Sequence, residues 1–149
     1  MIEFVKGDLF ESGCEALVNP VNCVGISGKG LALEFKKRFP ANFDAYAHAC
    51  KQRNIGPGLP FVFDTGTASY PWYIVNFPTK RHWREASQLG DIESGLKALK
   101  GIIRQRMIES IALVPLGCGL GGLSWDDVRP LIALILADSP GVRIAVYEP

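Results

Sequence analysis

Short strand-like segments alternate with helix-like segments along the whole chain. The spacing predicts a helix over 91–107, because apolar residues recur at every third or fourth position. These are Ile92, Leu96, Leu99, Ile103 and Met107. Further helices are expected over 30–39, 43–53 and 125–137, and strands over 2–6, 16–20, 61–64, 72–77, 111–115 and 142–147.

This alternation is typical of an α/β fold with helices on both faces of one sheet. The segment Gly66-Thr-Ala-Ser69 between two strands predicts a hairpin, so the sheet is mixed, although mostly parallel. Pro40 is expected to end the helix over 30–39. We therefore predict a three-layer α/β/α sandwich made by a single domain over 1–149, which is also compatible with one domain of a longer protein.

Composition excludes several classes of protein. Apolar residues make up 48% and charged residues 21%, as in an ordinary soluble domain, and no apolar run approaches the roughly 18 residues of a spanning helix. The four cysteines, Cys14, Cys23, Cys50 and Cys118, are widely spaced without a Cys-x-x-Cys pair. This spacing favours reduced thiols in the cytoplasm and no metal site. The net charge of +1 gives no global nucleic-acid signature, and we expect a monomer without a membrane partner.

Two glycine-rich turns, each between a strand and a helix, carry the main functional signal. Glycine allows positive φ and a close approach of the backbone to a ligand, and free N–H groups at a helix start attract anions. Two such turns in one small domain suggest a ligand with two phosphates. The first contains Gly28, Lys29 and Gly30 and leads into Leu31; the second contains Gly117, Cys118, Gly119, Leu120, Gly121 and Gly122.

A dinucleotide fingerprint is a rival interpretation of the second turn. Gly117-x-Gly119-x-x-Gly122 fits its spacing, and Glu148 ends the next strand. In that fingerprint, however, the glycines open the helix, whereas the expected helix cap here is Ser124. Neither turn continues to Gly-Lys-Ser/Thr, which argues against a nucleotide triphosphatase loop.

Polar or glycine-rich segments follow three predicted strands, over 16–20, 72–77 and 111–115, and are expected to meet in one cleft. The third of these segments is the second glycine turn. Ligands bind at the carboxyl ends of strands in open α/β sheets. Asn22 follows the strand over 16–20, and it is either a turn residue that satisfies nearby backbone or a group that holds a sugar hydroxyl. Lys80 follows the strand over 72–77, and it is either a solvated surface lysine or a partly desolvated amine able to form a Schiff base.

Three other segments have both a structural and a functional interpretation. Arg81, Trp83 and Arg84 form either a solvated rim or a surface on which a single strand of nucleic acid is bound through phosphate contacts and stacking. Asp8 is either a cap at a strand end or a reader of a base. Tyr147 is either a cover of the core or a stacking platform.

Over essentially its whole length, the sequence resembles the macrodomain family, the ADP-ribose-binding α/β/α module. The resemblance rests on Val5-Lys-Gly7-Asp8-Leu9, on Asn22 before Gly28-Lys-Gly30-Leu-Ala32, and on 115–122. It implies that the two turns hold the diphosphate and the distal ribose. It also implies that Asp8 reads the adenine amino group, that Leu9 contacts the ligand and that Tyr147 lies by the adenine. ADP-ribose is the implied ligand or product, with no cofactor.

The segment Asn76-Phe-Pro-Thr-Lys80-Arg-His-Trp-Arg84 is similar to one branch of that family. The branch includes the terminal ADP-ribose protein glycohydrolase and, as the nearer match, the bacterial DNA ADP-ribosyl glycohydrolase antitoxin. The resemblance implies that Lys80 is the main catalytic residue and that Asn22 assists it by orienting the distal ribose. Gly121 stands where the protein-directed enzyme has a catalytic aspartate, and Asn19-Pro-Val-Asn22 differs from the Asn-Ala-Ala-Asn of deacetylase-like members.

The resemblance implies hydrolysis of the N-glycosidic bond that joins ADP-ribose to a base in single-stranded DNA. The implied partners are ADP-ribosylated single-stranded DNA and a cognate DNA ADP-ribosyltransferase toxin. Arg81, Trp83 and Arg84 are the expected DNA contacts. The alternatives are a non-catalytic reader of ADP-ribosylated protein and a hydrolase of ADP-ribosyl esters on acidic side chains.

Overall fold

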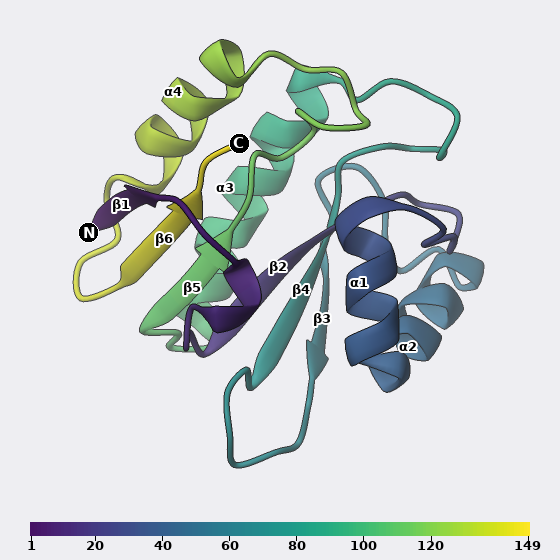
Figure 1. Cartoon of the computed structure of the whole chain (residues 1–149), viewed down its shortest axis with the longest axis horizontal. Coiled ribbons are helices and arrows are strands. Elements are labelled where there is room, and N and C mark those ends of the chain that lie inside the picture. The colour runs from purple at the N-terminus through teal and green to yellow at the C-terminus, as the bar shows by residue number, and fades with distance from the viewer.

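The computed structural model describes residues 1–149 and places one six-stranded sheet between two layers of helices (Figure 1). The strands follow the order β1-β6-β5-β2-β4-β3, and every neighbouring pair is parallel except β3 and β4. This arrangement confirms the predicted α/β/α sandwich and its hairpin. The strands are β1 (Ile2–Val5), β2 (Ala16–Val21), β3 (Phe61–Asp64), β4 (Tyr73–Pro78), β5 (Ser110–Leu113) and β6 (Arg143–Tyr147). The helices are α1 (Gly30–Arg38), α2 (Pro40–Lys51), α3 (Leu89–Gln105) and α4 (Trp125–Leu136), with a short 3₁₀ turn at Leu9–Glu11.

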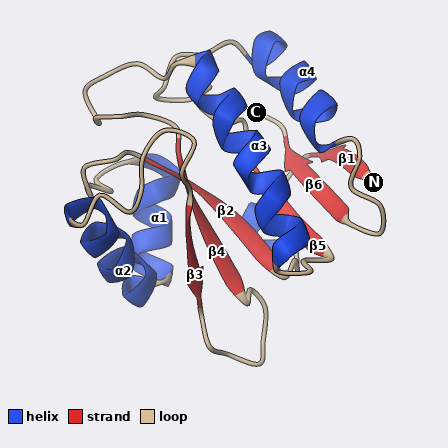
Figure 2. Cartoon of the chain, turned by 180° about the vertical axis from the view of Figure 1, so that it is seen from behind, coloured by secondary structure: helices blue, strands red, loops and turns tan.

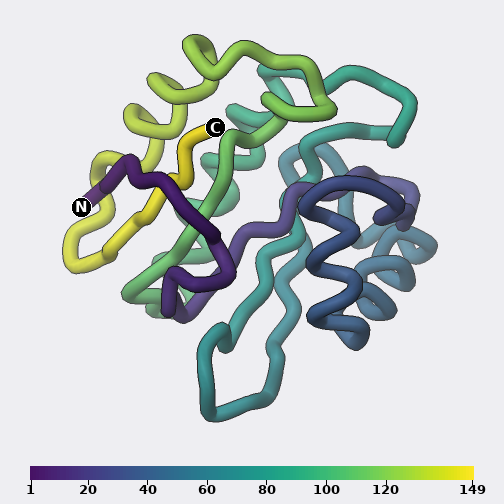
Figure 3. The backbone as a smooth tube through the Cα atoms, in the orientation of Figure 1, coloured from purple at the N-terminus to yellow at the C-terminus, as the bar shows by residue number.

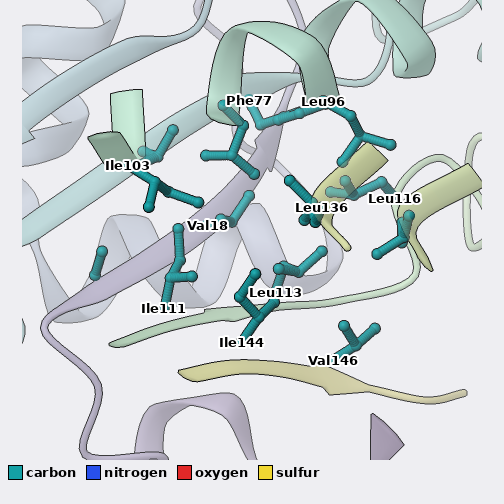
Figure 4. Packing of buried hydrophobic residues seen from close by; sticks show 14 of the residues in the cluster. Val18, Phe77, Leu96, Ile103, Ile111, Leu113, Leu116, Leu136, Ile144 and Val146 are labelled. Carbon is teal, nitrogen blue, oxygen red and sulfur yellow. The ribbon is translucent and has the colours of Figure 1, made fainter. Parts of the chain in front are cut away.

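The larger hydrophobic core lies between the sheet and the helices α3 and α4, which cover the face seen in Figure 2. Val18, Ile111 and Ile144 project from neighbouring strands into this core, where they pack near the buried side of α3 (Figure 4). Side chains alternate between the two faces of a strand, so Leu17, next to Val18, lies in the opposite core with Phe35 of α1. Burial on both faces explains why the β2 sequence shows an apolar run instead of a strict alternation.

The structure corrects two helix boundaries. Met107 was expected to continue the apolar face of α3, but the helix ends at Gln105, and Met107 has φ +55° and is 80% exposed. Pro40 was expected only to end a helix; it is also the first residue of α2, which begins three residues earlier than predicted. A proline fits the first helical position, because the N–H that it lacks has no partner there in any helix.

Three buried asparagines connect the sheet to α2. The Asn76 carboxamide oxygen in β4 accepts from Asn19 in β2 at 3.1 Å and from Asn42 in α2 at 3.2 Å. The Asn76 amide group in turn donates to the Asn42 oxygen at 2.8 Å. Buried amides are costly unless they are hydrogen-bonded, so this network fixes β2, β4 and α2 relative to one another. It therefore sets the positions of the loops that follow β2 and β4.

Candidate functional site

The segments predicted to form a cleft lie together at the carboxyl edge of the sheet. In the backbone trace of Figure 3, the loops after β2, β4 and β5 come near one another at this edge. Three backbone hydrogen bonds join these segments directly: Thr79 to Val21, Cys23 to Arg81, and Ser87 to Gly121. The sequence-based expectation that these loops converge is therefore confirmed.

The first glycine turn presents a run of unpaired backbone donors. The N–H groups of Gly28, Lys29, Gly30 and Leu31 donate no hydrogen bond within the protein. The residue that precedes α1, Lys29, provides no side-chain cap, and Gly30 turns the chain into the helix with φ +59°. Free N–H groups at a helix N-terminus carry partial positive charge and bind anions.

The second glycine turn presents a similar run. The N–H groups of Gly119, Leu120 and Gly121 donate no hydrogen bond within the protein. Such successive free donors form a concave anion-binding surface. The Leu120 side chain is 68% exposed, and its Cδ1 lies 3.7 Å from the position that a Cβ on Gly30 would occupy. The two glycine turns are therefore close to each other at Gly30 and Leu120.

Gly121 is required by packing and not by its backbone conformation. A Cβ on Gly121 would lie 2.1 Å from Ser87 Oγ and 2.4 Å from the Gly117 carbonyl oxygen. Ser87 is 7% exposed, its N–H donates to the Gly121 carbonyl at 2.9 Å, and its hydroxyl has no hydrogen-bond partner. Sequence reasoning missed Ser87, because it lies in a polar stretch with no motif around it. The Ser87 side chain occupies the space that the Cβ of any larger residue at position 121 would need.

The Asn22 side chain organises its own loop. It is 8% exposed, and its Oδ1 accepts from the N–H groups of Val24 and Gly25, each at 3.1 Å, while its amide group donates to the Ile26 carbonyl at 2.7 Å. The Tyr46 hydroxyl donates to Oδ1 at 2.8 Å. Burial raises the pKa of Tyr46, so this hydroxyl stays protonated and available as a donor. The turn interpretation of Asn22 is thus correct, and its contact with a sugar stays a prediction.

Lys80 lies beside Asn22 because the pairing of β2 with β4 continues past the strand ends. The N–H groups of Thr79 and Lys80 donate to the Val21 carbonyl at 2.8 and 3.4 Å, and the Cys23 N–H donates to the Arg81 carbonyl at 3.3 Å. Lys80 is half-buried, and its Nζ donates to the Trp83 carbonyl at 3.4 Å.

The thiol of Cys23 adds a further contact at the same place. Burial is the main reason that the pKa of Cys23 is raised to about 11, so the thiol is neutral near pH 7. It donates to the Lys80 carbonyl at 3.5 Å. The backbone on either side of the Lys80 side chain is therefore held by the loop that carries Asn22.

The three predicted DNA contacts have different environments. Arg81 forms a two-point ion pair with Asp91, with its Nε and Nη2 each 3.1 Å from a carboxylate oxygen. Trp83 is 43% exposed and stacks on His82, and the Arg84 guanidinium lies 4.5 Å from the centre of the Trp83 ring. All three are surface residues, but the Arg81 guanidinium already has a carboxylate partner. Their contacts with nucleic acid stay predictions.

The predicted adenine contacts lie at the ends of β1 and β6. Asp8 caps the 3₁₀ turn, since its Oδ1 accepts from the Phe10 N–H at 2.9 Å, and its second oxygen has no partner in the protein. The Leu9 side chain is buried in the core and is not available to a ligand. Tyr147 is half-buried with one ring edge near Gly7, and desolvation raises its pKa. The capping interpretation of Asp8 is correct, and one oxygen is left for a ligand.

The structure gathers no group of three or more histidine, cysteine, aspartate or glutamate side chains suited to a metal ion. None of its helices combines the length and apolar character needed to cross a bilayer.

Comparisons with known proteins agree with this geometry. The family model described as Macro domain matches residues 18–132. The DNA ADP-ribosyl glycohydrolase of Thermus aquaticus is 49% identical over 149 residues, covering 100% of this chain and 41% of that protein. The solved macrodomain of Thermus aquaticus DarG has 49% identity and a TM-score of 0.97, covering 100% of this chain and 99% of that one.

A second solved structure, Thermosipho africanus DarTG in complex with ADP-ribose, has 35% identity and a TM-score of 0.94. The match covers 99% of this chain and 41% of that one. The chain thus spans only about two fifths of the length of the DNA ADP-ribosyl glycohydrolases that it matches, 41% and 42% for the first two. The family match covers most of the chain and the fold agrees throughout, and the chain belongs to the Macro domain family.

Proposed function

We propose that the chain is an ADP-ribose-binding glycohydrolase that removes ADP-ribose from a modified base in single-stranded DNA. One observation carries the proposal: the backbones of Lys80 and Asn22 are neighbours at the sheet edge that also carries the two runs of free N–H groups. The donors of both turns suit the two phosphates of ADP-ribose. The names of relatives with up to 49% identity, DNA ADP-ribosyl glycohydrolases, support the same substrate.

The proposed reaction adds water across the bond between the anomeric carbon of the distal ribose and a nitrogen of the base. The base leaves with a proton, and the sugar keeps the hydroxyl. As an ammonium group, Lys80 stabilises or protonates the departing nitrogen. As a free amine, it captures the ring-opened aldehyde as a Schiff base, which water then hydrolyses. Borohydride separates the two roles, because it traps a protein–ADP-ribose adduct only in the second.

Single-stranded DNA is the expected substrate, because a base that is modified by so large a group must leave the helical stack to enter a cleft. Trp83 is exposed enough to stack on a neighbouring base, and Arg84 lies over its ring as a phosphate contact. If these groups bind DNA, affinity for an oligonucleotide falls as salt rises. Affinity that does not change with salt would remove both residues from the DNA surface.

The alternatives predict different products. A non-catalytic reader binds ADP-ribose and releases neither base nor sugar. A hydrolase of ADP-ribosyl esters acts on modified protein; the packed Gly121 disfavours it, since no carboxylate fits at that position. A relative from Thermosipho africanus is named a fusion of DNA ADP-ribosyl transferase and DNA ADP-ribosyl glycohydrolase, which supports a cognate toxin as partner. We place this activity in the cytoplasm, in a monomer whose four cysteines are free.

The test compares wild type with Lys80→Ala on ADP-ribosylated single-stranded DNA and on ADP-ribosylated protein. Lys80→Ala is expected to slow release from DNA by about 10²-fold or more, because positioned acid or base groups contribute that much. Its affinity for free ADP-ribose stays near that of wild type. Lys97→Ala, an exposed lysine on α3, is the control and keeps full activity. An inactive wild type refutes the enzyme, and an active Lys80→Ala refutes the role of Lys80.

A further inference from the structure

The segment 79–88, which carries Lys80, contains neither helix nor strand. Within it, the Glu85 N–H donates to the His82 carbonyl at 3.0 Å and the Arg84 N–H donates to His82 Nδ1 at 3.1 Å. A third contact, from Lys80 Nζ to the Trp83 carbonyl at 3.4 Å, also stays within the segment. All three join residues of the segment to one another, so they do not fix Lys80 relative to the rest of the site. The position of Lys80 is therefore set by what anchors this segment from outside.

Arg81 supplies such an anchor through both its backbone and its side chain. Its carbonyl accepts from the Cys23 N–H at 3.3 Å, which ties it to the loop after β2. Its guanidinium forms the two-point pair with Asp91 in the first turn of α3. The Asp91 side chain is only 13% exposed, so the carboxylate is held in place by the helix around it. Arg81 thus joins three elements at the residue that follows Lys80.

We infer that Arg81 is a positioning residue for Lys80 and not a contact for DNA, an inference that rests on the proposed function. A planar guanidinium is suited to this task, because its parallel N–H groups fix both the distance and the angle to a carboxylate. The Arg81 side chain is 51% exposed, but two of its donors are already used by Asp91. The Asp91 carboxylate also neutralises the positive charge of Arg81, which would otherwise attract a DNA phosphate.

The two roles make different predictions for substitution. A lysine at position 81 keeps the positive charge but cannot form the planar two-point contact. If Arg81 positions Lys80, then Arg81→Lys, Arg81→Gln and Asp91→Asn all lower kcat. If Arg81 binds DNA through its charge, Arg81→Lys keeps activity, Arg81→Gln raises KM for the oligonucleotide, and Asp91→Asn has no such effect.

The experiment measures kcat and KM on ADP-ribosylated single-stranded DNA for these variants and for Arg81→Gln/Asp91→Asn. Each single variant is expected to lower kcat about tenfold or more, because small displacements of a reacting group are costly. The double variant is expected to match the worse single one, since both substitutions break the same contact. Arg104→Gln, which breaks an exposed pair with Asp138 at the opposite edge of the sheet, is the control and leaves kcat unchanged.

Hydrogen exchange tests the anchor independently of activity. The N–H groups of Thr79, Lys80 and Ser87 are hydrogen-bonded in the structure and are expected to exchange faster in Arg81→Gln and in Asp91→Asn. If wild type is active and Arg81→Gln retains its kcat, the inference is overturned. If wild type is inactive, the proposed function fails, and unchanged exchange in the variants then also overturns the anchor.

Discussion

Gly121→Ala is the substitution for which the structure makes the sharpest prediction. The new Cβ would lie 2.1 Å from Ser87 Oγ, 2.4 Å from the Gly117 oxygen and 2.9 Å from the Gly117 carbonyl carbon. Two of these three atoms belong to the backbone of the same turn, so a change of side-chain rotamer cannot relieve the clash. The turn has to open, and the bond from the Ser87 N–H to the Gly121 carbonyl is strained or broken.

The magnitude follows from these two losses. Overpacking of a well-packed site costs about 1–3 kcal/mol, and a lost hydrogen bond adds about 0.5–1.5 kcal/mol. In a domain of this size, each kcal/mol of lost stability lowers the melting temperature by about 2–4 °C, so we expect a fall of about 3–18 °C. Because the N–H groups of the same turn are the proposed diphosphate donors, affinity for ADP-ribose falls as well.

Gly119→Ala is the matched control in the same turn. A Cβ on Gly119 meets no atom within 4 Å, and its φ is not in the left-handed region, so the change is expected to leave the melting temperature close to wild type. Calorimetric unfolding of both variants and isothermal titration with ADP-ribose decide the matter. Equal melting temperatures for Gly121→Ala and Gly119→Ala would falsify the argument that Ser87 and Gly117 close the turn.

Three further predictions concern stability. Gly95→Ala places a Cβ 2.4 Å from Phe77 Cζ and is expected to destabilise the protein by about 1–3 kcal/mol. The better helix propensity of alanine does not offset this loss. A rise in the denaturant midpoint would contradict the prediction. Glu15→Ala removes the acceptor of two backbone N–H groups at 2.7 Å and is expected to lower the free energy of unfolding by about 3 kcal/mol. ADP-ribose affinity is expected to stay unchanged, because Glu15 lies at the opposite edge of the sheet. An unchanged denaturant midpoint argues against this prediction. The pKa of Cys23 is about 11 in the folded protein against 9.0 ordinarily, so the folded state holds its proton more tightly and stability is lost as pH rises from 9 towards 11. Cys23→Ala makes that decline shallower, and an identical slope in both proteins refutes the assignment.

Local patterns were sufficient for the architecture and for the chain segments of the site. The apolar spacing of α3 and the glycines before α1 and α4 place these helices within a few residues, because helix periodicity and turn chemistry act over short distances. The end of α3 was missed at Met107, since a residue with positive φ leaves no mark on the apolar spacing.

What sequence reasoning missed depends on contacts between distant segments. Nothing around Arg81 indicates that it meets Asp91, and nothing around Ser87 indicates that it packs against Gly121. Asn22 had two open interpretations, because the choice depends on Tyr46, which arrives from α2. Partners of this kind are fixed by the packing of the sheet and helices and become visible only in three dimensions.

The candidate site draws on the ends of five strands, β1, β2, β4, β5 and β6, from Asp8 near one terminus to Tyr147 near the other. The position of each loop depends on a strand that pairs with a strand distant in the sequence. A fragment of the chain is therefore not expected to keep the site geometry. A molecule that bridges these loops therefore recognises only the completed domain and protects all of it at once against unfolding. Saturating ligand should slow exchange of amides as remote as those of β3, and a refolding chain should regain binding only in its final, cooperative step.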